Sequence, residues 1–193
     1  MNICVFGASS ARLAPCYIEA AEELGRLLGR GGHRLIFGGG QTGLMGACAR
    51  GAASAGGEII GIAPRFFDEP GVLFEQCTRF VFTDTMAQRK TAMEEEAEAF
   101  IVLPGGIGTL EEFFEVLTLR QLGRHGKPIA LLNTAGCYDA LSAMLEKLAS
   151  EGFMSREVPT LFRLCAEPAQ ALQAVLEAPQ IGQRDLDLRR YSK

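Results

Sequence analysis

The sequence has no tryptophan and only two histidines, His33 and His125, among its 193 residues. Each histidine stands beside a glycine at a predicted helix end, so a metal site built on histidine is not expected. The six cysteines include no CxxC pair, which argues against a zinc ribbon and against a redox dithiol. We therefore expect no metal site, and cysteines that serve as small core side chains in a reduced cytoplasm.

The chain also lacks an apolar run long enough to cross a bilayer, since its longest runs have the length of a strand. Its start, MNICVFGASS, has neither the basic region nor the apolar region of a signal peptide. The net charge of −4 argues against general binding to nucleic acid polymers. These absences predict a cytoplasmic protein without a membrane or nucleic acid partner, in which an anionic ligand needs local positive potential.

Short apolar runs alternate with helical stretches along the chain. Most of the runs are continuously apolar, which is typical of strands buried on both faces of a parallel sheet. Strand–helix–strand order implies right-handed crossovers, so we predict a single-domain α/β fold with a doubly wound parallel sheet and helices on both faces. This domain spans residues 1–177, and 178–193 form a polar C-terminal tail. The predicted strands are 2–6, 34–38, 58–64, 79–84, 99–104, 128–133 and 160–165, and the predicted helices are 15–30, 43–55, 85–97, 109–123, 138–150 and 168–176.

Three glycine-rich loops follow the first, second and fifth predicted strands. They read FGASSARLAP from Phe6, GGGQTGLMG from Gly38 and PGGIGTLEE from Pro104. Glycine lets a ligand approach the backbone amides, and each loop feeds a helix N-terminus, which favours an anion. One such loop is explained by a tight turn alone. Three at the carboxyl edge of one sheet predict a phosphate-binding site.

The second of these loops also matches the GxGxxG pattern through Gly38, Gly40 and Gly43. A dinucleotide site needs in addition an acid at the tip of the next strand, about twenty residues on. Glu58 has that spacing but lies at the start of the next strand, at the wrong edge of the sheet. An NAD site is therefore not predicted, and the absence of GK[ST] after the glycines disfavours ATP hydrolysis.

The predicted helix 85–97 places Met86, Arg89, Lys90 and Met93 on one face. One interpretation is an exposed helix whose Lys90 pairs with Glu94 and whose methionines contact the core. The other is a cationic stripe for a phosphorylated ligand, with a methionine against its base. The position of this helix after the carboxyl end of a strand favours the second interpretation.

Four motifs carry a resemblance to a known family. PGGIGTLEE resembles the PGGxGTxxE motif of the LONELY GUY family, cytokinin riboside 5′-monophosphate phosphoribohydrolases that are often mislabelled lysine decarboxylases. GGGQTGLMG, MAQRK and FGASS are similar to further segments of that family, in the same order, over residues 2–177. The first loop departs from the family pattern at Ala8, and Ile107 fills a slot that is often aromatic.

The resemblance implies a Rossmann-like fold and hydrolysis of the N-glycosidic bond of adenosine-type nucleoside 5′-monophosphates, such as AMP or a cytokinin riboside monophosphate. The products are the free base and ribose 5-phosphate, and no cofactor is implied. A lysine decarboxylase is not expected, because no lysine is placed as a Schiff-base anchor beside a pyridoxal phosphate loop. Which monophosphate is the physiological substrate stays open. A non-catalytic nucleotide carrier or sensor on the same fold is the alternative.

By position, the resemblance makes Arg89 and Glu112 the catalytic residues. A carboxylate near the anomeric carbon can stabilise positive charge on the sugar and orient water, and an arginine can hold substrate oxygens. Glu111 is the substitute if Glu112 points away. Thr109 and Glu112 also match a capping box, with Thr109 as the N-cap, which is a purely structural interpretation of the same motif. The expected substrate-binding residues are Ser9, Gly39, Met86, Lys90, Gly105, Gly106, Gly108 and Thr109.

The helix predicted from Thr109 is apolar nearly all round in its later turns. Such a helix needs cover on two sides. The sheet supplies one side, and either a partner subunit or another helix of the chain supplies the other. Together with the resemblance, this pattern predicts a homodimer.

Overall fold

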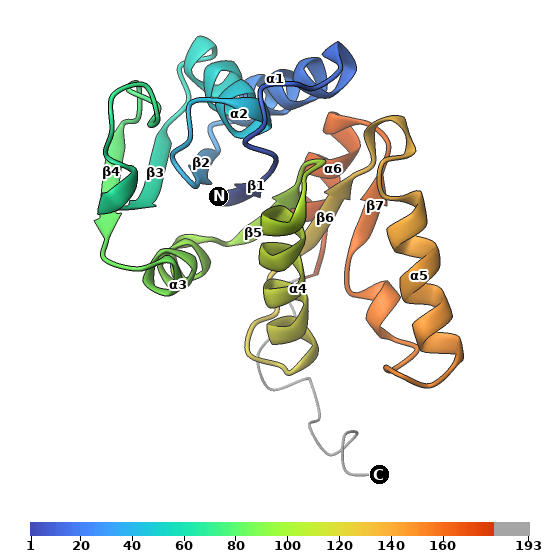
Figure 1. Ribbon diagram of the computed structural model, residues 1–193. Coiled ribbons are helices and arrows are strands. Elements are labelled where there is room, and N and C mark those ends of the chain that lie inside the picture. The colour runs from blue at the N-terminus through green and yellow to red at the C-terminus, as the bar shows by residue number, and fades with distance from the viewer. Residues whose placement is uncertain (180–193) are drawn as a thin grey trace.

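The computed structural model describes residues 1–179, which form a seven-stranded parallel sheet in the order β4-β3-β2-β1-β5-β6-β7 (Figure 1). The predicted α/β fold is therefore confirmed. The polar tail over 178–193 stays a prediction, since 180–193 lie outside the described residues. The strands are β1 Asn2–Phe6, β2 Arg34–Phe37, β3 Ile59–Pro64, β4 Arg79–Thr83, β5 Ala99–Val102, β6 Ile129–Leu132 and β7 Arg163–Cys165.

Helices cover both faces of the sheet, so the fold is doubly wound as predicted (Figure 1). One face packs against α1 Pro15–Arg30, α2 Gly43–Ser54 and α6 Pro168–Leu176. The other packs against α3 Met86–Glu96, α4 Ile107–Gln121 and α5 Asp139–Ser150. Short 3-10 turns lie at η1 Arg65–Phe67, η2 Thr134–Gly136 and η3 Val158–Thr160. No helix within residues 1–179 is both long enough and apolar enough to cross a membrane.

The strands supply side chains to two separate cores because successive residues of a strand point to opposite faces. In β1, Ile3 and Val5 join the core under α1, α2 and α6, whereas Cys4 and Phe6 join the core under α3, α4 and α5. All four side chains are almost fully buried. Burial on both faces explains why the strands are continuously apolar in the sequence rather than alternating.

The strand order reverses at β1, whose neighbours are β2 on one side and β5 on the other. The crossovers therefore leave in opposite directions there, and a crevice opens beyond the carboxyl ends of β1 and β5. The three glycine-rich loops meet at this point. The Ala8 N–H donates to Pro104 O at 3.1 Å, and the Leu44 N–H donates to Ala8 O at 2.8 Å. The fold thus brings the loops together as the sequence predicts.

Candidate active site

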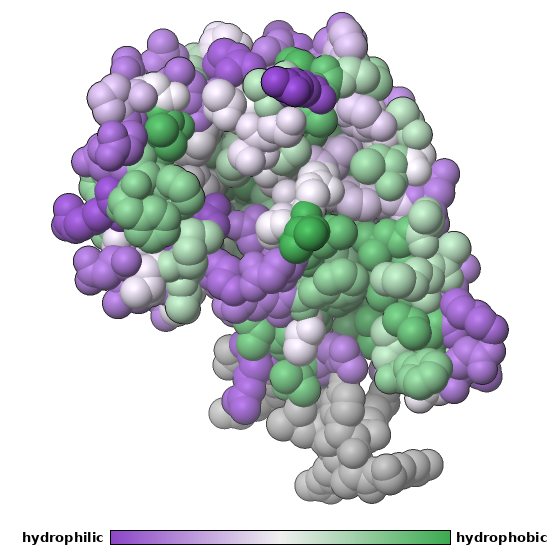
Figure 2. All heavy atoms as spheres, in the orientation of Figure 1, coloured by the Kyte–Doolittle hydropathy of each residue, from purple (hydrophilic) through white to green (hydrophobic). Residues whose placement is uncertain are grey.

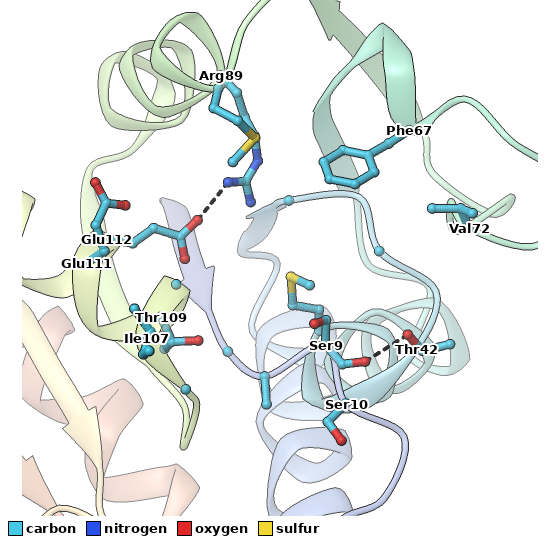
Figure 3. Close-up of a pocket in the computed structure, with 18 of the residues that line it drawn as sticks. Ser9, Ser10, Thr42, Phe67, Val72, Arg89, Ile107, Thr109, Glu111 and Glu112 are labelled. Atoms are coloured by element: carbon cyan, nitrogen blue, oxygen red, sulfur yellow. Dashed lines mark hydrogen bonds and ion pairs between the residues drawn. The ribbon is translucent and has the colours of Figure 1, made fainter.

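A cavity of about 500 Å³ lies at this reversal of strand order, between the loops after β1 and β2, the loop between β3 and β4, and the starts of α3 and α4 (Figure 3). Many of the residues predicted to bind substrate or catalyse line it. Gly39, Lys90 and Gly105 do not. The predicted residues that line the cavity are Ser9, Met86, Arg89, Gly106, Gly108, Thr109 and Glu112.

Arg89 and Glu112 form a buried ion pair on one wall of the cavity, as the dashed line in Figure 3 marks. Nη1 of Arg89 donates to Oε1 of Glu112 at 2.8 Å, and Nε donates to the carbonyl of Ile62 at 3.3 Å. Burial raises the pKa of the Glu112 carboxyl, and the charge of Arg89 opposes that rise only in part. The cavity therefore holds a carboxylate that takes up a proton more readily than an exposed glutamate does.

Gly38 makes room for this arginine. A Cβ atom on Gly38 would lie 2.0 Å from Nη2 of Arg89, so the guanidinium would have to leave its present position. The sequence identified Gly38 only as part of a loop that exposes amides. The structure gives it a second reason to be glycine: the guanidinium lies directly against its backbone at the end of β2.

The N-terminus of α4 opens into the cavity. Gly106 precedes the helix, and its carbonyl accepts the first helical hydrogen bond, from the Leu110 N–H at 3.0 Å. Within residues 1–179, the amides of Ile107, Gly108 and Thr109 have no hydrogen-bond acceptor, as is usual for a first helical turn. A Cβ on Gly106 or Gly108 would meet no described atom within 4 Å. Packing therefore does not require these glycines, and the open space before the amides suits an anion.

The N-terminus of α2 borders the same cavity but is already occupied. The Ala8 carbonyl accepts from the Leu44 N–H at 2.8 Å and from the Met45 N–H at 3.4 Å. The hydroxyl of Thr42 donates to Ser9 O at 2.9 Å (Figure 3). Two amides in the first turn of α2 are thus occupied by a carbonyl of the chain, unlike those of Ile107, Gly108 and Thr109 in α4.

The capping-box interpretation of Thr109 and Glu112 is wrong. The N-cap position of α4 is Gly106, so Thr109 is the third residue of the helix and Glu112 the sixth. The carboxylate of Glu112 turns to Arg89 and does not reach back to the helix start. The helix begins two residues before the predicted 109 because Ile107 and Gly108, which look like loop residues, form its first turn.

Two of the predicted binding glycines serve packing. A Cβ on Gly105 would lie 2.1 Å from Oγ1 of Thr109. Gly39 has a φ of 76°, which favours glycine, and a Cβ there would lie 2.6 Å from the ring of Phe80. Both shape the loops that border the cavity while the cavity wall itself is made by their neighbours.

The side chain of Lys90, unlike that of the adjacent Arg89, points out of the cavity toward α4. Its Nζ pairs with the carboxylates of Glu111 and Glu115, not with Glu94 of its own helix. These hydrogen bonds, the one to Glu111 first, raise the pKa of Lys90, so it is a fixed positive charge. Met86, on the same helix, lies at the cavity rim and is 42% exposed.

An apolar wall faces the ion pair across the cavity, and the sequence did not predict it. Phe67 and Val72 come from the segment between β3 and β4 and lie opposite Glu112 in Figure 3. The Gln41 N–H donates to Val72 O at 2.9 Å, which ties this segment to the loop after β2. The wall residues belong to RFFDEPGVLF, a segment with two apolar clusters that follows the carboxyl end of a strand. The cavity thus has an anion-binding end, a buried ion pair and an apolar wall.

Metal-ligating side chains do not gather in this cavity or elsewhere among residues 1–179, where no group of three or more His, Cys, Asp or Glu is placed to hold an ion. His125, one of the two histidines, lies outside the cavity and is buried beside α4.

The fold defines a class of doubly wound α/β proteins, and solved structures share it. The molybdenum cofactor carrier protein of Chlamydomonas reinhardtii superposes with a TM-score of 0.71 at 24% identity, covering 91% of this chain and 96% of that chain. The molybdenum cofactor binding protein of Rippkaea orientalis gives a TM-score of 0.70 at 24% identity, covering 89% and 93%. At this identity the likeness shows the fold alone.

Sequence comparison identifies the family. A family model described as "Possible lysine decarboxylase" matches residues 45–175. The cytokinin riboside 5′-monophosphate phosphoribohydrolase LOG2 of Arabidopsis thaliana is 38% identical over 176 residues, which cover 91% of this chain and 83% of the relative. The cytokinin riboside 5′-monophosphate phosphoribohydrolase of Rhodococcoides fascians is 38% identical over 90% of this chain and 88% of the relative. The chain belongs to this LONELY GUY family.

Proposed function

We propose that this protein hydrolyses the N-glycosidic bond of adenosine-type nucleoside 5′-monophosphates, releasing the free base and ribose 5-phosphate. The observation that carries the proposal is the buried pair of Arg89 and Glu112 beside the open N-terminus of α4. Family membership supports it, because relatives 38% identical over 90% or more of this chain are named for that reaction on cytokinin nucleotides.

The phosphate binds at the first turn of α4. The amides of Gly108 and Thr109 donate to its oxygens, and the helix dipole adds positive potential. This arrangement supplies the local positive potential that a chain of net charge −4 needs for an anionic ligand. The hydroxyl of Thr109, beside the same amides, is a further donor.

The glycosidic bond lies between this phosphate position and the apolar wall, beside Glu112. As the bond to the base breaks, its electron pair leaves with the base and positive charge develops on the sugar. The Glu112 carboxylate stabilises that charge and takes a proton from the attacking water, whose oxygen bonds to the anomeric carbon. The raised pKa of Glu112 suits a base that works near neutral pH. Arg89 holds substrate oxygens and counters negative charge on the departing base.

The base lies toward Phe67 and Val72. Aromatic and aliphatic side chains suit the faces of a purine, and a volume of about 500 Å³ falls within the range of small-molecule sites. An apolar wall of this kind accepts an adenine with or without an apolar substituent, so AMP and prenylated nucleotides are both candidates.

A carrier that binds a nucleotide without cleaving it is the second candidate, since solved structures of this fold are named molybdenum cofactor carrier proteins. A carrier needs the cavity and the open helix end. It has no need of a buried carboxylate whose pKa is raised beside an arginine. That feature favours the enzyme.

A chromatographic screen for released base distinguishes the two candidates. The panel contains AMP, a prenylated adenosine monophosphate, the other nucleoside monophosphates, and adenosine. We expect base release from one of the adenine monophosphates and much slower release from adenosine, because adenosine lacks the group that binds α4. Tight binding of AMP with no release of base from any member identifies a carrier. Equal turnover of AMP and adenosine rules out the phosphate position.

A further inference from the structure

Lys90 lies between two carboxylates of α4 on the outer side of the ion pair formed by Arg89 and Glu112. Its Nζ is 2.9 Å from Oε2 of Glu115 and also bonds Oε1 of Glu111. The two cations are neighbours in sequence on α3 and contact α4 at different places, Arg89 at Glu112 and Lys90 at Glu111 and Glu115. Two ionic contacts therefore join the helices: Arg89 and Glu112 both line the cavity, whereas Lys90 lies outside it and bonds Glu111 on the cavity wall.

The charges around Glu112 come from three elements. From α3, Arg89 and Lys90 both favour the ionised carboxylate, and from α4, Glu111 disfavours it. From β1, the thiol of Cys4 lies beneath, with a pKa raised by burial and by the charge of Glu112, so it stays neutral. Lys90 opposes the repulsion between Glu111 and Glu112 because its ammonium bonds Glu111 directly.

We propose that Lys90 is a positioning residue that acts through α4: it neutralises Glu111 and Glu115 and holds the second turn of the helix against α3, without contacting substrate. The proposal rests on the proposed function of Glu112. It replaces the role that the sequence suggested for Lys90 as a direct phosphate ligand, since Lys90 does not line the cavity.

The structure gives Lys90 and Glu111 opposite effects on Glu112. Lys90→Met removes the neutralising charge, so the pKa of Glu112 rises further above its ordinary value. Glu111→Gln removes the repelling charge, so the pKa of Glu112 falls. The double variant removes both charges and returns the pKa toward that of the parent. Lys90→Arg keeps the cation and leaves the pKa where it was.

The first experiment is an NMR titration of the Glu112 side-chain carboxyl in the full chain, which needs no activity. The matched control is Lys147→Met, which removes a lysine paired with Glu151 on the surface of α5 and changes the net charge by the same amount. We expect the pKa of Glu112 to shift upward in Lys90→Met and downward in Glu111→Gln. It stays near the parental value in the double variant and does not shift in Lys147→Met. An unchanged titration in both Lys90→Met and Glu111→Gln overturns the proposal.

The second experiment measures kcat/KM for AMP against pH in the same variants. Lys90→Met moves the acidic limb to higher pH, and each unit of movement lowers kcat/KM about tenfold on that limb. Adding Glu111→Gln reverses the movement, and Lys90→Arg shows none. A phosphate ligand behaves differently: Lys90→Met then raises KM for AMP at every pH, and Glu111→Gln does not rescue it. That pattern overturns the proposal.

The two experiments separate failure of this inference from failure of the proposed function. If the parent releases no base from any nucleotide, the proposed function fails, while the titration still decides whether Lys90 controls Glu112. If Lys90→Met unfolds, Glu111→Gln provides the same test with the opposite sign. If the parent cleaves AMP and the acidic limb lies at the same pH in both variants, the proposed function is retained and the role of Lys90 is excluded.

Discussion

Nη1 of Arg89 lies 2.8 Å from Oε1 of Glu112, and the two side chains are only 9% and 10% exposed. The residues come from consecutive helices, α3 and α4, that pack on the same face of the sheet with β5 between them in the chain. Taking two charges out of water is costly, and a buried ion pair often stabilises a fold no more than apolar side chains of similar volume would. The pair is therefore expensive as a structural device, and its place on the cavity wall accords with the proposed catalysis.

Glu112→Gln tests that proposal. Glutamine keeps an oxygen that accepts from Arg89 but cannot take a proton from water. We expect a loss of base release on the order of 10²–10⁴-fold, with the fold and AMP binding retained. Circular dichroism, calorimetric titration with AMP and the base-release assay measure these three properties. If Glu112→Gln keeps the parental rate and Glu111→Gln abolishes it, Glu111 is the catalytic carboxylate.

Gly38→Ala tests how closely Arg89 must be placed. The new methyl group would lie 2.0 Å from Nη2, so the guanidinium has to move away from it. Misplacement of a catalytic group by about 1 Å costs on the order of 10²-fold in rate. We expect a loss of that size in kcat, with a melting temperature near that of the parent.

A double-mutant comparison controls the Gly38→Ala experiment. When Arg89 is already alanine, no guanidinium remains to be displaced, so adding Gly38→Ala has no further effect on the rate. If the two losses instead add up fully, the glycine is needed for the loop or the ligand and not for Arg89.

The sequence predicts most of the fold because its signals are local. Helix α1 runs from Pro15 to Arg30 as predicted, since proline is favoured in the first turn and Gly31 and Gly32 end the helix. The start of α4 was placed too late because glycine and proline around residues 104–108 are typical of a loop. Only the structure shows that Gly106 adopts the N-cap position and that the helix begins with Ile107.

The candidate site was predicted in part, for a similar reason. Arg89 and Glu112 each belong to a motif, and parallel topology brings motifs at strand ends to one edge. The contact of Gly38 with Arg89, the wall of Phe67 and Val72, and the pairing of Lys90 with Glu111 join segments far apart in the chain. No periodicity or spacing connects such segments, so these features needed the structure.

The burial of His125 leads us to expect that the free energy of unfolding depends on pH. This histidine is 4% exposed, its Nε2 lies 3.0 Å from Val116 O, and its Nδ1 accepts from the Lys127 N–H at 3.2 Å. Burial, and then the charge of Lys127, lower its pKa from 6.5 to about 4. Between these values the unfolded chain binds more protons at this residue than the folded chain does. The contribution of His125 to the free energy of unfolding is therefore present above about pH 6.5 and lost as the pH falls toward 4.

Urea denaturation of the parent and of His125→Gln at a series of pH values measures this effect. The raised pKa of Glu112 acts in the opposite direction over part of the range, but it is common to both proteins. We expect the stability of the parent to fall more steeply with acid than that of the variant, although the variant is less stable at pH 7. Parallel curves would show that His125 does not titrate as its burial implies.

The outer surface of α4 and α5 predicts a homodimer. Figure 2 shows apolar side chains gathered over these two helices. Large apolar side chains on this surface include Ile107 at the start of α4, which is 88% exposed, and Met144 in the middle of α5, which is 48% exposed. A contiguous patch of this kind typically marks an interface, and a stable dimer buries about 800 Å² on each partner. We expect light scattering at micromolar concentration to give twice the chain mass of 20.8 kDa.

Met144→Lys places a charge in this surface, so it lowers the mass to that of one chain at the same concentration while the monomer stays folded. The control is Leu176→Lys at the end of α6, which packs on the other face of the sheet and is exposed to a similar degree, 41%. It keeps the parental mass, because a charge on that helix lies outside the proposed interface. A parent that is monomeric, or a dimer lost in Leu176→Lys and kept in Met144→Lys, would contradict an interface over α4 and α5.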